Sequence, residues 1–178
     1  MFLLRLEQTI NAFSDWLGKI SAVLFVLMLF NVFYDVITRY LFNDVSIGMQ
    51  ELEWHLFAAM FMLGVPFTLR AGGHVRVDIV YEGLSLKRKA FVDLFGILTL
   101  LFPFCLLVAW YGVDFARESF ELGETSGDPG GLSYRWVIKA VIPFALFCTF
   151  ISGVGMMLRS INILKGHHQG DDYIPTQH

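Results

Sequence analysis

Charged and chemically reactive side chains are scarce in this sequence. Only 16% of its 178 residues are charged, whereas a soluble domain has about 25%. The two cysteines, Cys105 and Cys148, stand apart in apolar runs, without a CxxC motif or a histidine at ligand spacing. This excludes a disulfide framework and a cysteine-ligated metal site, and we expect both thiols to be packing residues. No basic run combines with stacking aromatics on a polar surface, so nucleic acid is not an expected partner.

Long apolar runs, by contrast, fill most of the chain, and 56% of the residues are hydrophobic. A helix needs about 20 mostly apolar residues to cross the hydrocarbon core, where its backbone must satisfy its own hydrogen bonds. The sequence therefore predicts an all-α integral membrane protein with four transmembrane helices in a single membrane domain, 1–178. The predicted spans are 16–38, 52–71, 91–113 and 137–159, followed by a tail, 160–178. The first apolar run is longer than the ~7–15 residues of a signal peptide core, so we expect an uncleaved anchor.

None of the four runs carries an ionisable residue near its middle. Asp35, Glu53, Asp93 and Asp114 fall near the ends of runs, and His55 lies near the start of the second. Pumps and ion carriers usually hold such a residue at depth, so this chain alone is not predicted to be a pump or a channel. The paired axial histidines of a haem anchor are missing as well. We expect no catalytic residue, cofactor or metal site, and the chain is not predicted to be an enzyme.

The positive charges are distributed unevenly between the two predicted sides. One side holds nine of the thirteen Lys and Arg residues: Arg5, Lys19, Arg70, Arg76, Lys87, Arg88, Lys89, Arg159 and Lys165. The other side holds Arg39, Arg117, Arg135 and Lys139, together with most of the acidic residues. Positively charged loops stay in the cytoplasm. We therefore expect both termini to be cytoplasmic.

The two longer loops differ in character. Gly72 and Gly73 predict that the second helix stops there. The alternating apolar residues that follow predict a short segment lying at the inner membrane interface, with a simple polar connector as the competing interpretation. The cations of residues 87–89 are expected either to fix the topology of the chain or to meet anionic lipid headgroups. The opposite loop contains GDPGG at 127–131, which cannot continue a helix, and it is either solvated or in contact with a soluble partner.

Small residues recur every four positions along the fourth run, at Ala145, Thr149 and Gly153. Such a stripe lets another helix approach closely. The sequence leaves two interpretations open: the stripe packs the four spans together, or it contacts a partner subunit.

Three segments, in this order, resemble one known family. They are RYLF at 39–42, ELEWHLFAAMFMLG at 51–64 and RAGGHVRVD at 70–78, and they are similar to the small membrane subunit of TRAP (tripartite ATP-independent periplasmic) transporters, the DctQ-like family. The segment GETSGDPGGLSYRWVIKAVIP resembles the branch named for mannitol or chloroaromatic compounds. One departure is that the family's carboxylate pair beside the second span appears here as Glu51 and Glu53, split by Leu52.

The resemblance implies a secondary transporter for organic acids in a bacterial or archaeal inner membrane. Its expected partners are a large membrane subunit, a periplasmic substrate-binding protein and membrane lipid. The small subunit would act as a scaffold for the large subunit and help to dock the binding protein. The alternative is a membrane anchor or assembly subunit of an unrelated complex, such as a respiratory enzyme.

Several residues are expected by position to order the two ends of the bundle. Arg39, Glu51, Glu53 and Trp54 form a predicted outer cluster that orients the first two spans. Arg70, His74 and Asp78 are predicted to order the inner loop. The competing interpretation for each is an ordinary interfacial anchor.

Overall fold

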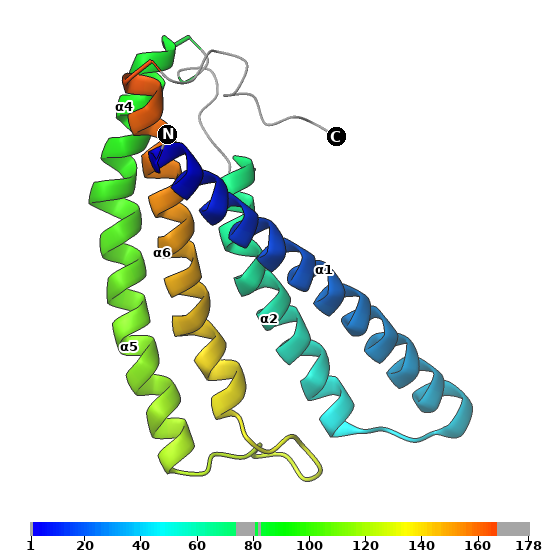
Figure 1. Cartoon of the computed structure of the whole chain (residues 1–178). Coiled ribbons are helices and arrows are strands. Elements are labelled where there is room, and N and C mark those ends of the chain that lie inside the picture. The colour runs from blue at the N-terminus through cyan, green and yellow to red at the C-terminus, as the bar shows by residue number, and fades with distance from the viewer. Residues whose placement is uncertain (1, 74–80, 82, 167–178) are drawn as a thin grey trace.

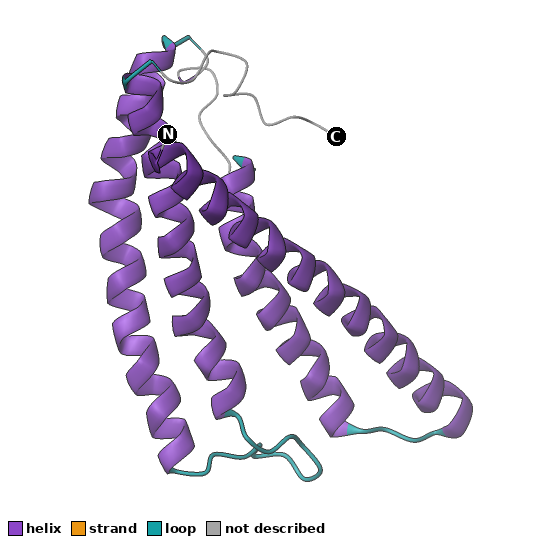
Figure 2. Ribbon diagram, in the orientation of Figure 1, coloured by secondary structure: helices purple, strands orange, loops and turns teal. Residues whose placement is uncertain are grey.

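The computed structural model describes residues 2–73, 81 and 83–166, and all regular structure in this part of the chain is helical (Figure 2). The elements, in order, are α1 (Phe2–Phe42), α2 (Ile47–Ala71), α4 (Leu86–Gly96), η1 (Ile97–Leu101), α5 (Phe102–Glu121) and α6 (Trp136–Leu164). α4, η1 and α5 form one continuous helical stretch. Within the described residues, four such stretches are long and apolar enough to cross a membrane. The predicted all-α fold with four transmembrane helices is confirmed to that extent.

Each predicted span lies inside one of these four helical stretches, but the stretches are longer than the spans. α1 has 41 residues and is therefore about 60 Å long, twice the thickness of a hydrocarbon core. α6 continues to Leu164, so the first part of the predicted tail is helical, and Ser160 and Asn162 in it are buried. Polar contacts between these extensions, described below, explain why the helices continue past their apolar runs.

α6 is the central helix of the bundle. It contacts α1, α2, α4, η1 and α5. In its most apolar 18-residue segment 44% is buried inside the protein, against 6–11% in the corresponding segments of the other three stretches. α5 runs beside α6 in the opposite direction, while α1 and α2 form an antiparallel pair that is steeply inclined to them (Figure 1). The start of α1 and the end of α6 lie at the same end of the bundle (Figure 1).

Glycines mark the points where these helices approach most closely. A Cβ atom added at Gly18 of α1 would lie 2.7 Å from the ring of Phe67 in α2, and one at Gly155 of α6 would lie 2.7 Å from Cγ2 of Ile10 in α1. Gly112 of α5 faces Pro143 of α6 in the same way, at 3.2 Å. Small residues are a common means of close helix packing in membranes, where the hydrophobic effect does not drive helices together.

The ends of α2 are fixed by local chemistry. Ser46 is its N-cap, with the hydroxyl accepting from the backbone N–H of Met49. At the other end Gly72 has a φ of 69°, and the N–H of Gly73 donates to the carbonyl of Thr68 at 3.0 Å. The left-handed conformation suits glycine because it has no Cβ. The helix stop predicted at Gly72 and Gly73 is confirmed.

The third stretch contains a π-helical turn, η1, immediately before Pro103. The backbone N–H of Phe102 donates to the carbonyl of Ile97, five residues earlier. Proline has no N–H, and its ring would clash with the carbonyl four residues before it. A wider turn accommodates the proline without breaking the helix, and such π-bulges are frequent at functional sites.

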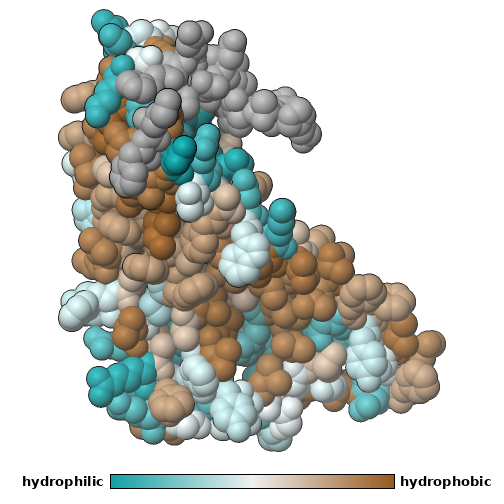
Figure 3. All heavy atoms as spheres, in the orientation of Figure 1, coloured by the Kyte–Doolittle hydropathy of each residue, from teal (hydrophilic) through white to brown (hydrophobic). Residues whose placement is uncertain are grey.

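The outer surface of the bundle is strongly apolar. Phe30 and Phe33 on α1 are 67% and 65% exposed, and Leu100 and Trp110 on the third stretch are 72% and 73% exposed. Apolar side chains cover most of the visible face, and polar groups gather toward its ends (Figure 3). A soluble monomer rarely exposes so much apolar surface, so these faces suit lipid or another membrane helix.

Candidate functional site

The loop that joins α5 to α6, residues 122–135, folds back onto the beginning of α2. Its anchor is Glu51, only 7% of which is exposed. Oε1 of Glu51 accepts a hydrogen bond from the hydroxyl of Ser126 at 2.5 Å, and Oε2 accepts one from the backbone N–H of Leu132 at 2.6 Å. We call Glu51, Ser126 and Leu132 the outer latch. Hydrogen bonds to an ionised acceptor are stronger than neutral ones, so the latch holds the loop against α2.

Two glycines allow this loop to approach α2 closely. Gly130 has a φ of 84°, a conformation that other residues adopt rarely. A Cβ at Gly131 would lie 2.8 Å from Oε2 of Glu51, and a Cβ at Gly48 of α2 would lie 3.1 Å from the carbonyl oxygen of Gly130. The GDPGG segment therefore does more than end a helix, because its glycines let the backbone reach the carboxylate.

Further contacts join the same loop to the helices around it. The guanidinium of Arg135 lies 5.6 Å from the centre of the Trp54 ring, a distance typical of a cation–π contact. Lys139 forms an ion pair with Glu124 of the loop. The hydrogen bond from Lys139 lowers the pKa of the Glu124 carboxyl below its ordinary value, because it favours the charged form. The loop is thus fixed at three places, on α2 and on α6.

The structure brings together only part of the predicted outer cluster. Glu51 and Trp54 both contact the α5–α6 loop. Arg39 forms an ion pair with Asp35, one turn earlier in α1, and not with the α2 residues. Glu53 is half-buried and has no hydrogen bond or ion pair with any described residue. The contact between the ends of α1 and α2 is instead made by Asn31, whose side-chain N–H donates to the carbonyl of Met49 at 2.9 Å.

At the opposite end of the bundle, Arg70 joins α2 to α1. Its guanidinium lies 2.8 Å from the carboxylate of Asp15, both groups being about one-third exposed. This pair contacts a helix, whereas the sequence predicted that Arg70 would order the loop that follows. His74, Asp78 and the predicted interfacial segment lie outside the described residues.

Polar side chains also join α1 to α6 where the two helices cross. The side-chain N–H of Asn162 donates to the carboxylate of Glu7 at 2.7 Å, and the hydroxyls of Ser14 and Ser152 are 2.6 Å apart. All four residues are at most 6% exposed. Sequence reasoning missed this crossing because it treated the first fifteen residues as a flank. The spacing of Glu7 and Ser14, seven residues apart on one helix face, was the available signal.

The small-residue stripe on α6 is buried inside the chain. Ala145 and Thr149 are 0% and 4% exposed, and Gly153 is buried. A Cβ at Gly153 would lie 2.8 Å from Cδ2 of Leu101 in η1. Thr149 donates its hydroxyl proton to the carbonyl of Ala145 at 2.8 Å. Of the two interpretations, the burial favours packing among the helices of this chain.

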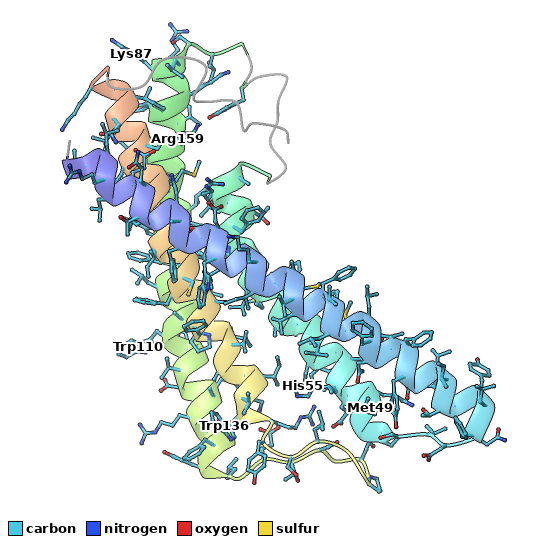
Figure 4. The ribbon with its side chains drawn as sticks, turned by 45° about the vertical axis from the view of Figure 1, so that its right-hand side comes forward. Met49, His55, Lys87, Trp110, Trp136 and Arg159 are labelled. Carbon is cyan, nitrogen blue, oxygen red and sulfur yellow. The ribbon has the colours of Figure 1, made fainter. Side chains whose placement is uncertain are left out.

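Taken together, these contacts hold helices and a loop in place. Within the part of the chain that the structure describes, no group of three or more His, Cys, Asp or Glu side chains is arranged to hold a metal ion. Two charged residues of the loop contact the helices, Glu124 through Lys139 of α6 and Arg135 through Trp54 of α2 (Figure 4 shows Trp136 and His55 at this end of the bundle, with Lys87 and Arg159 at the other). The arrangement is suited to presenting a fixed outer surface.

Comparison with known proteins relates this chain to one family and to one curated relative in particular. The family model for the DctQ component of tripartite ATP-independent periplasmic transporters matches residues 28–162. A curated protein of Haemophilus influenzae (strain 86-028NP), the sialic acid TRAP transporter permease protein SiaT, is 27% identical to this chain over 142 residues. The alignment covers 79% of this chain and 22% of that protein, so this chain spans about a fifth of the relative's length.

Proposed function

The chain belongs to the DctQ component family of tripartite ATP-independent periplasmic transporters, and from this premise we propose a specific role for it. It is a non-catalytic small subunit that packs against a large transport subunit and helps to dock a substrate-binding protein. The transported solute is an organic acid or a related compound. Family membership and the four apolar helices make the chain a multi-pass protein of a bacterial inner membrane.

The observation that carries the docking role is the outer latch. A polar loop of fourteen residues would ordinarily be mobile at the end of a helical hairpin. Here Glu51 fixes it at two points, and the Arg135–Trp54 and Lys139–Glu124 contacts fix it at two more. A rigid surface binds with a smaller loss of conformational entropy than a mobile one. The loop is thus suited to receive a soluble partner.

The scaffold role is supported by the apolar faces of α1 and α5. Their aromatic and aliphatic side chains are exposed along most of each helix, while α6 is buried at the centre. The much greater length of the H. influenzae relative supports a larger membrane part with which this chain works, whether on the same polypeptide or on another.

The orientation follows from the charges at the two ends. We place the end of the bundle that carries the start of α1 and the end of α6 in the cytoplasm, because Lys87, Arg88 and Arg159 gather there. The outer latch then faces the periplasm, where a binding protein would be found. Labelling of single cysteines at Asp128 and Lys87 with a membrane-impermeant reagent in intact cells tests this orientation. Only the cysteine at 128 is expected to react.

The docking role is tested by loosening the latch while the bundle stays intact. Glu51→Ala removes both acceptors of the latch and is expected to lower uptake that depends on the binding protein, mainly by raising the binding-protein concentration needed for half-maximal uptake. Arg117→Gln is the matched control, because it removes an exposed charge that pairs with Glu121 on the same helix. Unchanged uptake by Glu51→Ala, at equal amounts of the subunit in the membrane, would contradict the docking role.

A further inference from the structure

An open groove lies on the outer face of the third helical stretch. It is lined by Gly96, Leu100, Leu101 and Phe104 and has a volume of about 440 Å³. Its walls are apolar, with Leu100 and Phe104 being 72% and 61% exposed. Because it opens sideways from a membrane helix, it faces the lipid or whatever replaces lipid there.

The groove is a consequence of the π-helical turn and of one glycine. Gly96 ends α4, and η1 begins at the next residue. A Cβ atom added at Gly96 would meet nothing within 4 Å, in contrast to Gly153 and Gly155 of α6, which abut other helices. This glycine is therefore not needed for packing within the chain. It leaves the floor of the groove open.

A row of side chains links the groove to the basic end of the helix. Arg88, Val92, Gly96, Leu100 and Phe104 are spaced four residues apart, so each lies next to the following one in a row that winds gradually around the helix. Arg88 is exposed and Val92 is 47% exposed. Arg88 lies about 12 Å along the helix from Gly96, and long basic side chains extend toward the headgroup region while their stems lie on apolar surface. Lys87 is exposed next to Arg88, at the end of the bundle where Figure 4 labels it.

From this arrangement we infer that the row from Arg88 to Phe104 is a binding site for one anionic phospholipid. Arg88 and Lys87 bind the phosphate of its headgroup, and one acyl chain lies over Val92 and Gly96 and fills the groove. The one acid close by on α4, Asp93, accepts a hydrogen bond from the hydroxyl of Tyr81 at 2.8 Å and lies on a neighbouring row. The two cations thus match the phosphate of the headgroup, and the apolar lining of the groove matches an acyl chain.

The alternative occupant of the groove is a helix of another membrane protein. A single half-buried glycine among large side chains offers such a helix little room for close approach, whereas an acyl chain is narrow enough to lie on it. Two exposed cations at the end of the row also match a phosphate better than they match an apolar helix. The inference does not depend on the transport role.

The test uses the full chain, purified in mild detergent with any partner that accompanies it. Native mass spectrometry measures how much phosphatidylglycerol and how much phosphatidylcholine remain bound after equal addition of each. We expect the protein to retain phosphatidylglycerol in preference. The double variant Lys87→Gln/Arg88→Gln removes the headgroup contacts and is expected to weaken that retention by about fivefold for each cation removed.

Gly96→Leu fills the groove and is expected to lower phosphatidylglycerol retention without changing the fold, since a Cβ atom at this position meets nothing within 4 Å. Matched controls are Leu107→Phe, which adds bulk on an exposed part of α5 outside the groove, and Arg117→Gln, which removes an exposed cation at the other end of the helix. Both are expected to retain phosphatidylglycerol as the unmodified protein does.

Three results would overturn the inference. Equal retention of the two lipids would show that no anionic lipid is selected. Loss on removing the cations but not in Gly96→Leu would show a basic patch that binds headgroups without the groove. Cross-linking of a cysteine placed at Leu100 to another protein in native membranes would show that the groove holds a protein helix.

Discussion

Replacing Gly155 with alanine is expected to weaken the crossing of α1 and α6. The added Cβ would lie 2.7 Å from Cγ2 and 3.4 Å from Cβ of Ile10, and real Cβ atoms do not approach other heavy atoms to 2.7 Å. Forcing a methyl group into a packed interface typically costs about 1–3 kcal/mol. Alanine also favours helix over glycine by up to about 1 kcal/mol. With a propensity gain of about 1 kcal/mol, the net loss in the free energy of unfolding is therefore about 0–2 kcal/mol.

Gly96→Ala is the matched control for this effect. Both glycines are helical, so the propensity gain is similar, but a Cβ at position 96 meets nothing within 4 Å. We expect its free energy of unfolding to be unchanged or higher by up to about 1 kcal/mol. Unfolding in mixed micelles with increasing SDS, followed by far-UV circular dichroism, measures both variants.

A second substitution distinguishes a steric clash from other causes. Ile10→Ala removes the atoms that the new methyl group would meet, so Gly155→Ala should cost less in an Ile10→Ala background than in the unmodified chain. This coupling is the quantity that a double-mutant cycle reports. Equal stability of the Gly155→Ala and Gly96→Ala variants, or the absence of coupling to Ile10, would refute the close packing of α1 on α6.

Three further changes test the polar contacts at the ends of the helices. In Glu51→Gln the side chain keeps one acceptor oxygen but turns an N–H group toward the latch donors. The backbone amide of Leu132 should therefore exchange with deuterium faster than in the unmodified chain. Unchanged exchange would show that the latch does not hold the loop. The lowered pKa of Glu124 means that its charged form stabilises the folded loop above the ordinary carboxyl pKa, and that this stabilisation is lost as the pH falls through the lowered value. Labelling of a cysteine at Asp128, expressed relative to that of a free thiol at the same pH, should therefore become faster on acidification, and Lys139→Gln should remove most of that pH dependence. Arg39→Gln leaves the buried carboxylate of Asp35 without its partner and should lower the free energy of unfolding by about 1–3 kcal/mol. The double variant Asp35→Asn/Arg39→Gln should recover part of that loss. A double variant no more stable than Arg39→Gln would show that the ion pair is unimportant.

The membrane-spanning part of the fold could be read from the sequence because hydropathy alone determines it. Runs of about 20 apolar residues leave few alternatives to helices. The full length of α1 could not be read in this way. Residues 2–15 are mixed in polarity, and they are helical because Glu7 and Ser14 pair with Asn162 and Ser152 of α6. Such pairing depends on contacts between distant parts of the chain, which hydropathy does not report.

Only the α2 part of the outer latch, Glu51, could be predicted from the sequence. Glu51 stood out as a carboxylate beside the second apolar run, and Trp54 as an interfacial aromatic residue. The partners of Glu51 include the backbone N–H of Leu132, a group that every residue except proline possesses and that leaves no mark in a sequence. Arg39 and Glu51 both lie near the same predicted membrane surface, but Arg39 pairs with Asp35, one helical turn away in its own helix.

The central claim is that this chain works as the small subunit of a tripartite transporter, and copurification tests it most directly. The full chain is isolated from its native membranes in mild detergent, and the proteins that accompany it are identified and quantified by mass spectrometry. The account predicts a large multi-span membrane protein in near-equal amount, with a periplasmic binding protein recovered in its presence. Recovery of redox subunits instead, or of the chain alone from membranes that contain the large subunit, would contradict it.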